Sequence, residues 1–130
     1  MTSAASRILI VDDEPSLLRM VSVYLGRLGY AVVTAASTEM AWAEVAAAPH
    51  AFALAVLDAT MSGIRLEDLA ARILAADPRV CVIATSGYPV NIATLLAAAP
   101  GRVMFLPKPF SPEMLGSAVR RLIATQEEDV

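Results

Sequence analysis

The stretch Phe52–Gly63, FALAVLDATMSG, is the most informative part of the sequence, because its almost unbroken apolar run ends abruptly in one carboxylate, Asp58. A short apolar run with turn residues just after it is typical of a strand buried on both faces, as in a parallel sheet covered by helices. Asp58 then lies where the strand leaves the core. Ligands of open α/β sheets bind in the crevice outside the carboxyl ends of the strands. The other strands therefore determine which groups join Asp58 at that rim.

Four further apolar runs are interpreted as strands, and turn or polar residues separate each from the next element. They are RILIV (7–11), AVVTA (31–35), VCVIAT (80–85) and VMFL (103–106). The segments between the runs have apolar residues at helical spacing or are rich in alanine. Helices are expected from Pro15 to Gly29, from a Ser37 cap to Pro49, and over about 66–76, 91–99 and 112–125.

Strands that alternate with helices across short loops predict a single parallel sheet, wound on both faces by right-handed crossovers. We expect an α/β, flavodoxin-like doubly wound (βα)5 fold with five helices and the strand order 2-1-3-4-5. Residues 1–6 are expected to form an N-terminal extension, 7–125 the domain, and 126–130 a frayed acidic tail.

The bulk composition excludes several classes of protein. The chain has 130 residues, of which 57% are hydrophobic and 18% charged, so one globular domain is expected. A net charge of −3 offers no basic footprint for nucleic acid or anionic lipid. No apolar run approaches the roughly 18 residues that span a bilayer, and no signal segment precedes the first strand. A cytoplasmic protein is the default, with Cys81 as a core thiol.

Acidic residues follow two neighbouring strands of the expected sheet. Asp12 and Asp13 end the first strand and Asp58 ends the third, so their carboxylates should converge. Such carboxylates repel by roughly 4 kcal/mol per pair at about 4 Å and an effective dielectric constant near 20. The cluster therefore needs a cation or must take up protons. Oxygen ligands without nearby His or Cys favour a hard metal, and a partly open site suits Mg²⁺.

Two more polar groups belong to the same rim. Ser86 follows the fourth strand and Lys108 follows the fifth. A divalent cation, an ammonium and a hydroxyl around one carboxylate suit a tetrahedral anion carried on that carboxylate. This combination is typical of phosphoryl transfer to aspartate.

The chain resembles a response-regulator receiver domain of two-component signalling, over residues 7–124. The motifs that carry the resemblance are VDDEP at 11–15, VLDATM at 56–61, ATSGY at 84–88 and FLPKPF at 105–110. Each motif alone is weak. Together they occur in the family's order, each at the end of its own expected strand.

The resemblance implies a role for each site residue. Asp58 would be the phosphoacceptor and also a Mg²⁺ ligand. Asp13 would bind Mg²⁺ directly, Asp12 largely through water, and the backbone carbonyl of Thr60 would complete the protein ligands. Lys108 would pair with the phosphoryl oxygens.

A second group of residues would form the family's switch. Ser86 is preferred over Thr85 as the switch hydroxyl because it directly precedes Gly87. Phe105 matches the aromatic switch position. Phosphorylation in the family remodels the face made by the fourth helix, fifth strand and fifth helix.

The resemblance also implies partners. A sensor histidine kinase or a histidine phosphotransfer protein would supply the phosphoryl group. No DNA-binding or catalytic domain follows residue 125, so a stand-alone receiver with a downstream protein partner, or onward phosphorelay, is expected. Direct binding to nucleic acid or membrane is not expected, and a homodimer is an alternative assembly. No turnover on an external substrate is expected.

Some positions depart from the family pattern. Ser62 stands where proline is usual and Leu66 where glycine is common, which leaves the shape of the metal loop open. Thr60 and Tyr88 occupy positions that in the family modulate water access to the acyl phosphate, and a bulky Tyr88 is hypothesised to slow hydrolysis.

Simpler interpretations stand beside these. Asp12 and Asp13 alone would suit a helix N-terminus, Phe105 would suit the core, and His50 is expected to be an exposed loop residue and a poor phosphodonor. A degenerate receiver that serves only as a protein-binding scaffold is the main alternative function. A hydrolase with an aspartyl intermediate is a further alternative, but such enzymes usually carry a second acid where this chain has Thr60.

Overall fold

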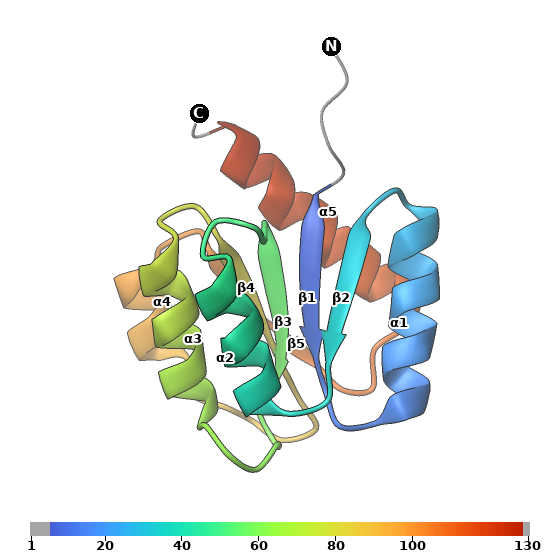
Figure 1. Ribbon diagram of the computed structural model, residues 1–130, viewed down its shortest axis with the longest axis horizontal. Coiled ribbons are helices and arrows are strands. Elements are labelled where there is room, and N and C mark those ends of the chain that lie inside the picture. The colour runs from blue at the N-terminus through green and yellow to red at the C-terminus, as the bar shows by residue number, and fades with distance from the viewer. Residues whose placement is uncertain (1–5, 129–130) are drawn as a thin grey trace.

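The five strands form one parallel sheet in the order β2-β1-β3-β4-β5, with helices on both faces (Figure 1). The computed structural model describes residues 6–128. The strands are β1 (Arg7–Val11), β2 (Ala31–Ala35), β3 (Leu54–Asp58), β4 (Cys81–Ser86) and β5 (Val103–Pro107). The helices are α1 (Pro15–Arg27), α2 (Thr38–Ala47), α3 (Leu66–Ala76), α4 (Ala93–Ala98) and α5 (Pro112–Glu128). The expected fold and strand order are confirmed.

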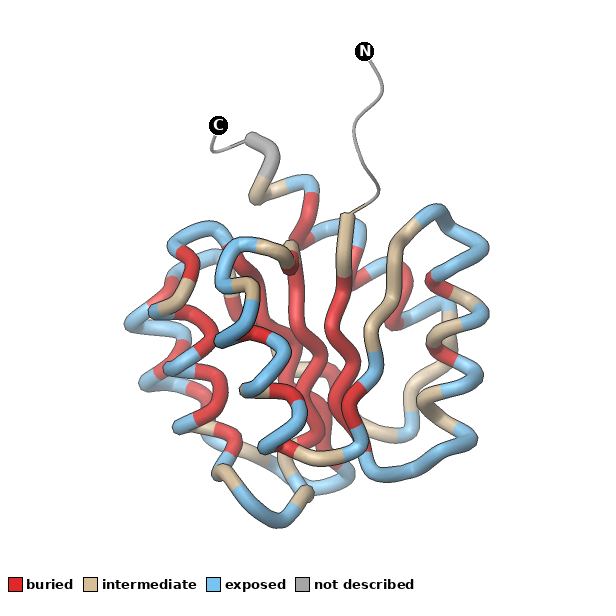
Figure 2. Tube along the Cα trace, in the orientation of Figure 1, coloured by how far each residue is buried: buried red, intermediate tan, exposed pale blue. Residues whose placement is uncertain are grey.

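Two apolar layers bury the sheet. On one face, α2, α3 and α4 pack against side chains such as Leu9, Leu57 and Val82. On the other face, α1 and α5 pack against Ile10, Val56 and their neighbours. Figure 2 shows the result, with the central strands buried along their length and the outer surfaces of the helices exposed. This burial on both faces explains why the sequences of the strands are nearly continuous apolar runs.

The switch in strand order creates the crevice at one edge of the sheet. β1 pairs with β2 on one side and with β3 on the other, so the chain leaves these strands in opposite directions. The loops after β1, β3, β4 and β5 all begin at this carboxyl edge, which lies at the bottom of Figure 1.

Local sequence signals fix the helix ends. The Ser37 hydroxyl accepts a hydrogen bond from the Met40 amide at 3.1 Å and caps α2, as expected. Gly29, with φ of 99°, follows the last turn of α1, where a left-handed backbone suits glycine. None of the described helices is long and apolar enough to cross a membrane.

Some expected boundaries were wrong. Ser86 belongs to β4 and not to the turn after it. Residues 126–128 continue α5, where we expected a frayed tail; 129–130 lie outside the described residues. The Gln126 side-chain amide donates to the backbone carbonyls of Ala53 and Arg79, and these bonds hold the last turn against the sheet.

Candidate functional site

Three carboxylates meet at the carboxyl edge of the sheet. Oxygen atoms of Asp12, Asp13 and Asp58 lie within 4.8 Å of one another. Asp12 is 2% exposed and Asp58 5%, whereas Asp13 faces solvent. We refer to these residues as the acid cluster. Its position next to the β1–β3 pair is the one that the strand order predicts.

The helix N-terminus does not account for the acid cluster. The residue that caps α1 is Glu14, whose side chain makes no capping hydrogen bond, and the first turn contains no acid. Asp12 Oδ1 instead accepts a hydrogen bond from the Glu14 amide at 2.9 Å, which orients the carboxylate within the loop. The other carboxylate oxygen of Asp12, Oδ2, faces the ammonium of Lys108.

Lys108 brings a positive charge to the acid cluster. Its Nζ donates a hydrogen bond to Asp12 Oδ2 at 2.8 Å and lies 3.4 Å from Asp58 Oδ2. The Lys108 backbone amide donates to the Ser86 carbonyl at 2.8 Å, so the residue is tied to the end of β4. The lysine side chain is 22% exposed, and its ammonium therefore reaches inward from the loop after β5.

The environment changes the pKa of Lys108. Burial is the largest single effect and acts to lower the pKa. The hydrogen bond and charge of Asp12, together with the nearby charge of Asp58, outweigh burial and raise the pKa above its ordinary value. Lys108 is therefore a fixed cation at neutral pH.

The charges at this edge do not balance. Three carboxylates face one ammonium, so the group carries a net charge of −2 when all are ionised. Among the described residues, no other side-chain cation lies within 4 Å of these carboxylates. The donors are all oxygen, one carboxylate is open to solvent, and the missing charge is that of a divalent cation. This donor set fits Mg²⁺.

Thr60 holds the remaining oxygen of Asp58. Its backbone amide and its hydroxyl both donate to Asp58 Oδ1, at 3.0 and 2.8 Å. The hydroxyl bond was not predicted from the sequence, although a threonine two residues after an aspartate is a known local partner for such a bond. Asp58 thus has one oxygen fixed by its own loop and the other facing Lys108.

The hydroxyl of Ser86 does not reach the acid cluster in this conformation. Ser86 is 1% exposed, and its Oγ accepts a hydrogen bond from the Tyr88 amide at 3.0 Å. Thr85 is the β4 residue paired with Asp58, and its hydroxyl donates to the Leu57 carbonyl at 3.4 Å. Neither hydroxyl donates to a carboxylate of the cluster.

The remaining candidate residues lie apart from the carboxylates. Phe105 is half-buried on the sheet face covered by α2, α3 and α4. Tyr88 is 71% exposed in the loop after β4. His50 is exposed in the connection after α2, as expected, but pairs with Asp77 at 3.6 Å, which was not predicted.

Comparison with known proteins gives a family match. The family model described as "Response regulator receiver domain" matches residues 8–120. The chain is 38% identical over 125 residues to the nitrogen assimilation regulatory protein NtrX of Azorhizobium caulinodans, covering 93% of this chain and 27% of that protein. It is 29% identical over 129 residues to the DNA-binding response regulator MtrA of Mycolicibacterium smegmatis, covering 99% of this chain and 55% of MtrA.

The fold has a close counterpart among solved structures. A CheY-like receiver domain protein from Methanospirillum hungatei JF-1 superposes with a TM-score of 0.85 at 25% sequence identity, covering 97% of this chain and 99% of that one. The curated relatives are longer, since the chain spans about a quarter of NtrX and about half of MtrA.

Proposed function

Because the chain belongs to the response regulator receiver domain family, we propose that it accepts a phosphoryl group from a phosphohistidine donor onto Asp58 in a Mg²⁺-dependent reaction. An oxygen of Asp58 attacks phosphorus, the P–N bond to the donor imidazole breaks, and the bonding electron pair leaves with the imidazole. The product is an aspartyl phosphate on this chain. The relatives are regulators, and a signalling role without turnover on an external substrate agrees with them.

The observation that supports the proposal is the unbalanced charge around Asp58. The three carboxylates and Lys108 together carry a net charge of −2, and an incoming phosphoryl group would add more negative oxygens. The site therefore needs a divalent cation for the reaction. Lys108 can pair with those phosphoryl oxygens because its ammonium lies 3.4 Å from Asp58 Oδ2. In a partly buried site, such fixed charges stabilise a transition state more than they do in water.

Mg²⁺ would be held by Asp12, Asp13 and Asp58, with the Thr60 carbonyl as a further ligand. When bound, it supplies positive charge that lowers repulsion between the acceptor and the phosphoryl oxygens. The chain's own residues then have separate tasks. Thr60 fixes one oxygen of Asp58, and Lys108 neutralises charge on the other side.

The proposed output is a change at the face of α4, β5 and α5. The Ser86 hydroxyl, which now accepts from Tyr88, would turn toward the phosphoryl group, and Phe105 would move inward. A sensor histidine kinase or a histidine phosphotransfer protein is the proposed donor, and the remodelled face would bind a downstream protein.

Intact-mass measurement tests the proposal. Wild type and Asp58→Asn are incubated with a small-molecule acyl phosphate, with and without Mg²⁺. We expect the mass of one phosphoryl group on wild type only, and only with the metal. Equal labelling of both proteins would refute Asp58 as the acceptor. Absence of label on either protein would favour the scaffold function instead, and steady hydrolysis of the donor with multiple turnover would favour a phosphatase.

A further inference from the structure

The loop after β3 is anchored at both ends. At its start, the Ala59 amide donates to the Thr85 carbonyl at 2.8 Å, and Thr60 is bonded to Asp58. At its far end, Ile64 is tied to α2, an element that contributes no residue to the acid cluster. We call residues 59–64 the metal loop, because the proposed carbonyl ligand of Thr60 lies within it.

Thr38 makes the distant anchor. This residue is the first of α2 and only 3% exposed. Its Oγ1 accepts a hydrogen bond from the Ile64 amide at 2.9 Å. The single hydroxyl proton has two acceptors within reach, the Ser62 carbonyl at 3.4 Å and the Glu39 carboxylate at 3.1 Å. One side chain thus contacts two backbone groups on the metal loop, 24 and 26 residues away.

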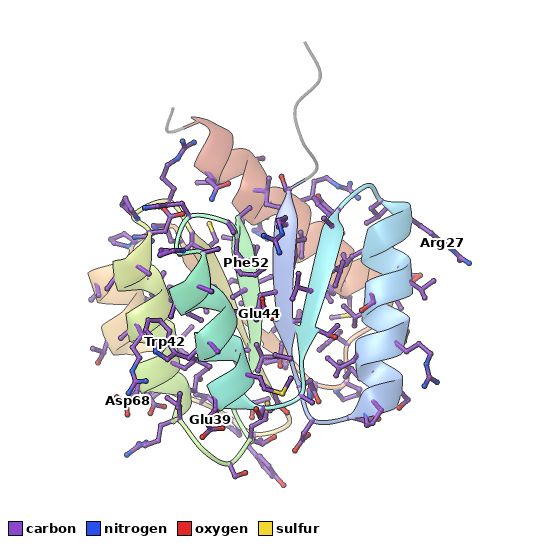
Figure 3. All side chains as sticks on the ribbon, in the orientation of Figure 1. Arg27, Glu39, Trp42, Glu44, Phe52 and Asp68 are labelled. Carbon is purple, nitrogen blue, oxygen red and sulfur yellow. The ribbon has the colours of Figure 1, made fainter. Side chains whose placement is uncertain are left out.

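Gly63 allows this close contact. Its φ is +96°, a left-handed conformation that suits glycine. A Cβ atom at this position would come within 3.0 Å of the Thr38 hydroxyl and the Glu39 carboxylate. Figure 3 shows Glu39 at the lower end of α2, beside the loop that follows β3. The metal loop and the start of α2 therefore fit together without space for a side chain at Gly63.

The anchor matters because the loop has little rigidity of its own. Residue 62 is a serine, so no proline ring fixes φ there. The loop has no regular hydrogen-bond pattern between the end of β3 and the start of α3. The bonds to Thr38 supply a tertiary constraint at the same place.

We propose that Thr38 is a positioning residue, which holds the metal loop so that the Thr60 carbonyl faces the acid cluster and thereby sets the affinity for Mg²⁺. The proposal rests on the Mg²⁺ site of the proposed function. Thr38 acts through the loop backbone and touches neither the metal nor the phosphoryl group. Loss of a group that hydrogen-bonds a metal ligand directly typically costs 10- to 100-fold in metal affinity or activity, so for Thr38, which bonds Ser62 and Ile64 beyond the ligand, we expect the lower end of that range.

Titration calorimetry with Mg²⁺ tests the proposal on three variants. Thr38→Val removes the acceptor of the Ile64 amide but keeps the shape, and we expect the Kd for Mg²⁺ to rise about tenfold. Thr38→Ser keeps the hydroxyl and should stay within about twofold of wild type. Thr125→Val is the matched control, because it deletes a hydroxyl that donates to the Arg121 carbonyl on α5. Its Kd should not change.

A comparison of limiting and saturating Mg²⁺ separates positioning from general damage. With an acyl phosphate donor, Thr38→Val should be labelled slowly at limiting Mg²⁺ and at the wild-type rate at saturating Mg²⁺. A Kd for Thr38→Val within twofold of wild type would overturn the proposal. So would equal weakening by Thr38→Ser, because the hydroxyl would then not be the group responsible.

A measurement on wild type serves if Thr38→Val does not fold. Mg²⁺ should slow hydrogen exchange of the Ile64 amide, which donates to Thr38, more than that of the Met40 amide. The Met40 amide is the control, because it lies in the same turn of α2 as Thr38 but donates to the Ser37 hydroxyl. Equal effects on both amides would contradict the coupling. The function proposed for Asp58 fails separately, if Thr38→Val weakens Mg²⁺ binding as expected but wild type takes no phosphoryl label.

Discussion

Lys108 and Asp12 are 96 residues apart in the sequence, yet the lysine Nζ lies 2.8 Å from Asp12 Oδ2. The contact joins the loop after β5 to the end of β1, and β3 and β4 lie between these two strands in the sheet. Lys108 is also the only lysine of the chain. The charge balance of the acid cluster therefore depends on one side chain.

The first prediction concerns the stability that this contact provides. Lys108→Met removes the cation and leaves two buried carboxylates without it, so we expect the free energy of unfolding at neutral pH to fall by about 1–3 kcal/mol. Denaturant unfolding without divalent metal measures the change. In an Asp12→Asn background the same substitution should cost less, by at least about 0.5 kcal/mol. Identical losses in both backgrounds would mean that the pair is not coupled.

The second prediction concerns high pH. The pKa of Lys108 is raised in the folded protein above its ordinary value of 10.5, so the folded state holds this proton more tightly than the unfolded state does. The stabilisation is fully present below pH 10.5 and is lost as the pH rises through the folded pKa. The difference in unfolding free energy between wild type and Lys108→Met should therefore shrink in that range.

Both proteins contain the same tyrosines, so the titration of the tyrosines cancels when the unfolding free energy of Lys108→Met is subtracted from that of wild type. We expect a constant difference between about pH 8 and pH 10 and a decline above it. A difference that already declines near neutral pH, or that grows in alkali, would contradict the assigned direction of the pKa change.

The third prediction concerns repulsion within the acid cluster. Asp13 has no ion-pair partner among the described residues, so its charge only adds to that of Asp12 and Asp58. Asp13→Asn should raise the free energy of unfolding by about 1 kcal/mol without metal, and should reduce the stabilisation that Mg²⁺ provides. Thermal unfolding with and without Mg²⁺ measures both effects.

Glu44→Gln is the control for Asp13→Asn. It removes the same charge from an exposed position on α2, which Figure 3 labels away from the carboxyl edge of the sheet. Its unfolding should respond to Mg²⁺ as wild type does. A similar loss of the Mg²⁺ effect in both variants would show that net charge, and not the acid cluster, is responsible.

Much of the site follows from strand order alone. Asp12, Asp58 and Lys108 are brought together because parallel strands place their carboxyl ends at one edge, and each residue lies at or directly after such an end. Periodicity and turn residues were sufficient to find those ends in the sequence.

Other features depend on contacts that no local pattern contains. The anchor made by Thr38 joins the metal loop to the start of α2, and packing brings these two segments together; the helix cap at Ser37 was the only signal nearby in the sequence. The last turn of α5 was misjudged from its acidic composition, because the bond from Gln126 to the Ala53 carbonyl is a tertiary contact. Tertiary contacts override local preference at such positions.

The fourth prediction concerns Tyr88. This residue is 71% exposed and its backbone amide donates to the Ser86 hydroxyl. We expect Tyr88→Ala to shorten the lifetime of the phosphorylated protein severalfold, because water would reach the acyl phosphate more easily. Decay of the phosphorylated mass after removal of the donor measures the lifetime. An unchanged lifetime would discard this role. Tyr88→Phe should match wild type, since it keeps the bulk of the ring.

The location of the phosphoryl group on the chain distinguishes Asp58 from the other two acids of the cluster. Wild type is treated with an acyl phosphate donor and Mg²⁺, and borohydride then reduces the aspartyl phosphate to homoserine, which peptide mass spectrometry locates. We predict homoserine at residue 58 alone, and none when Mg²⁺ is left out. Homoserine at residue 12 or 13, or at residue 58 regardless of Mg²⁺, would contradict Mg²⁺-dependent phosphorylation of Asp58.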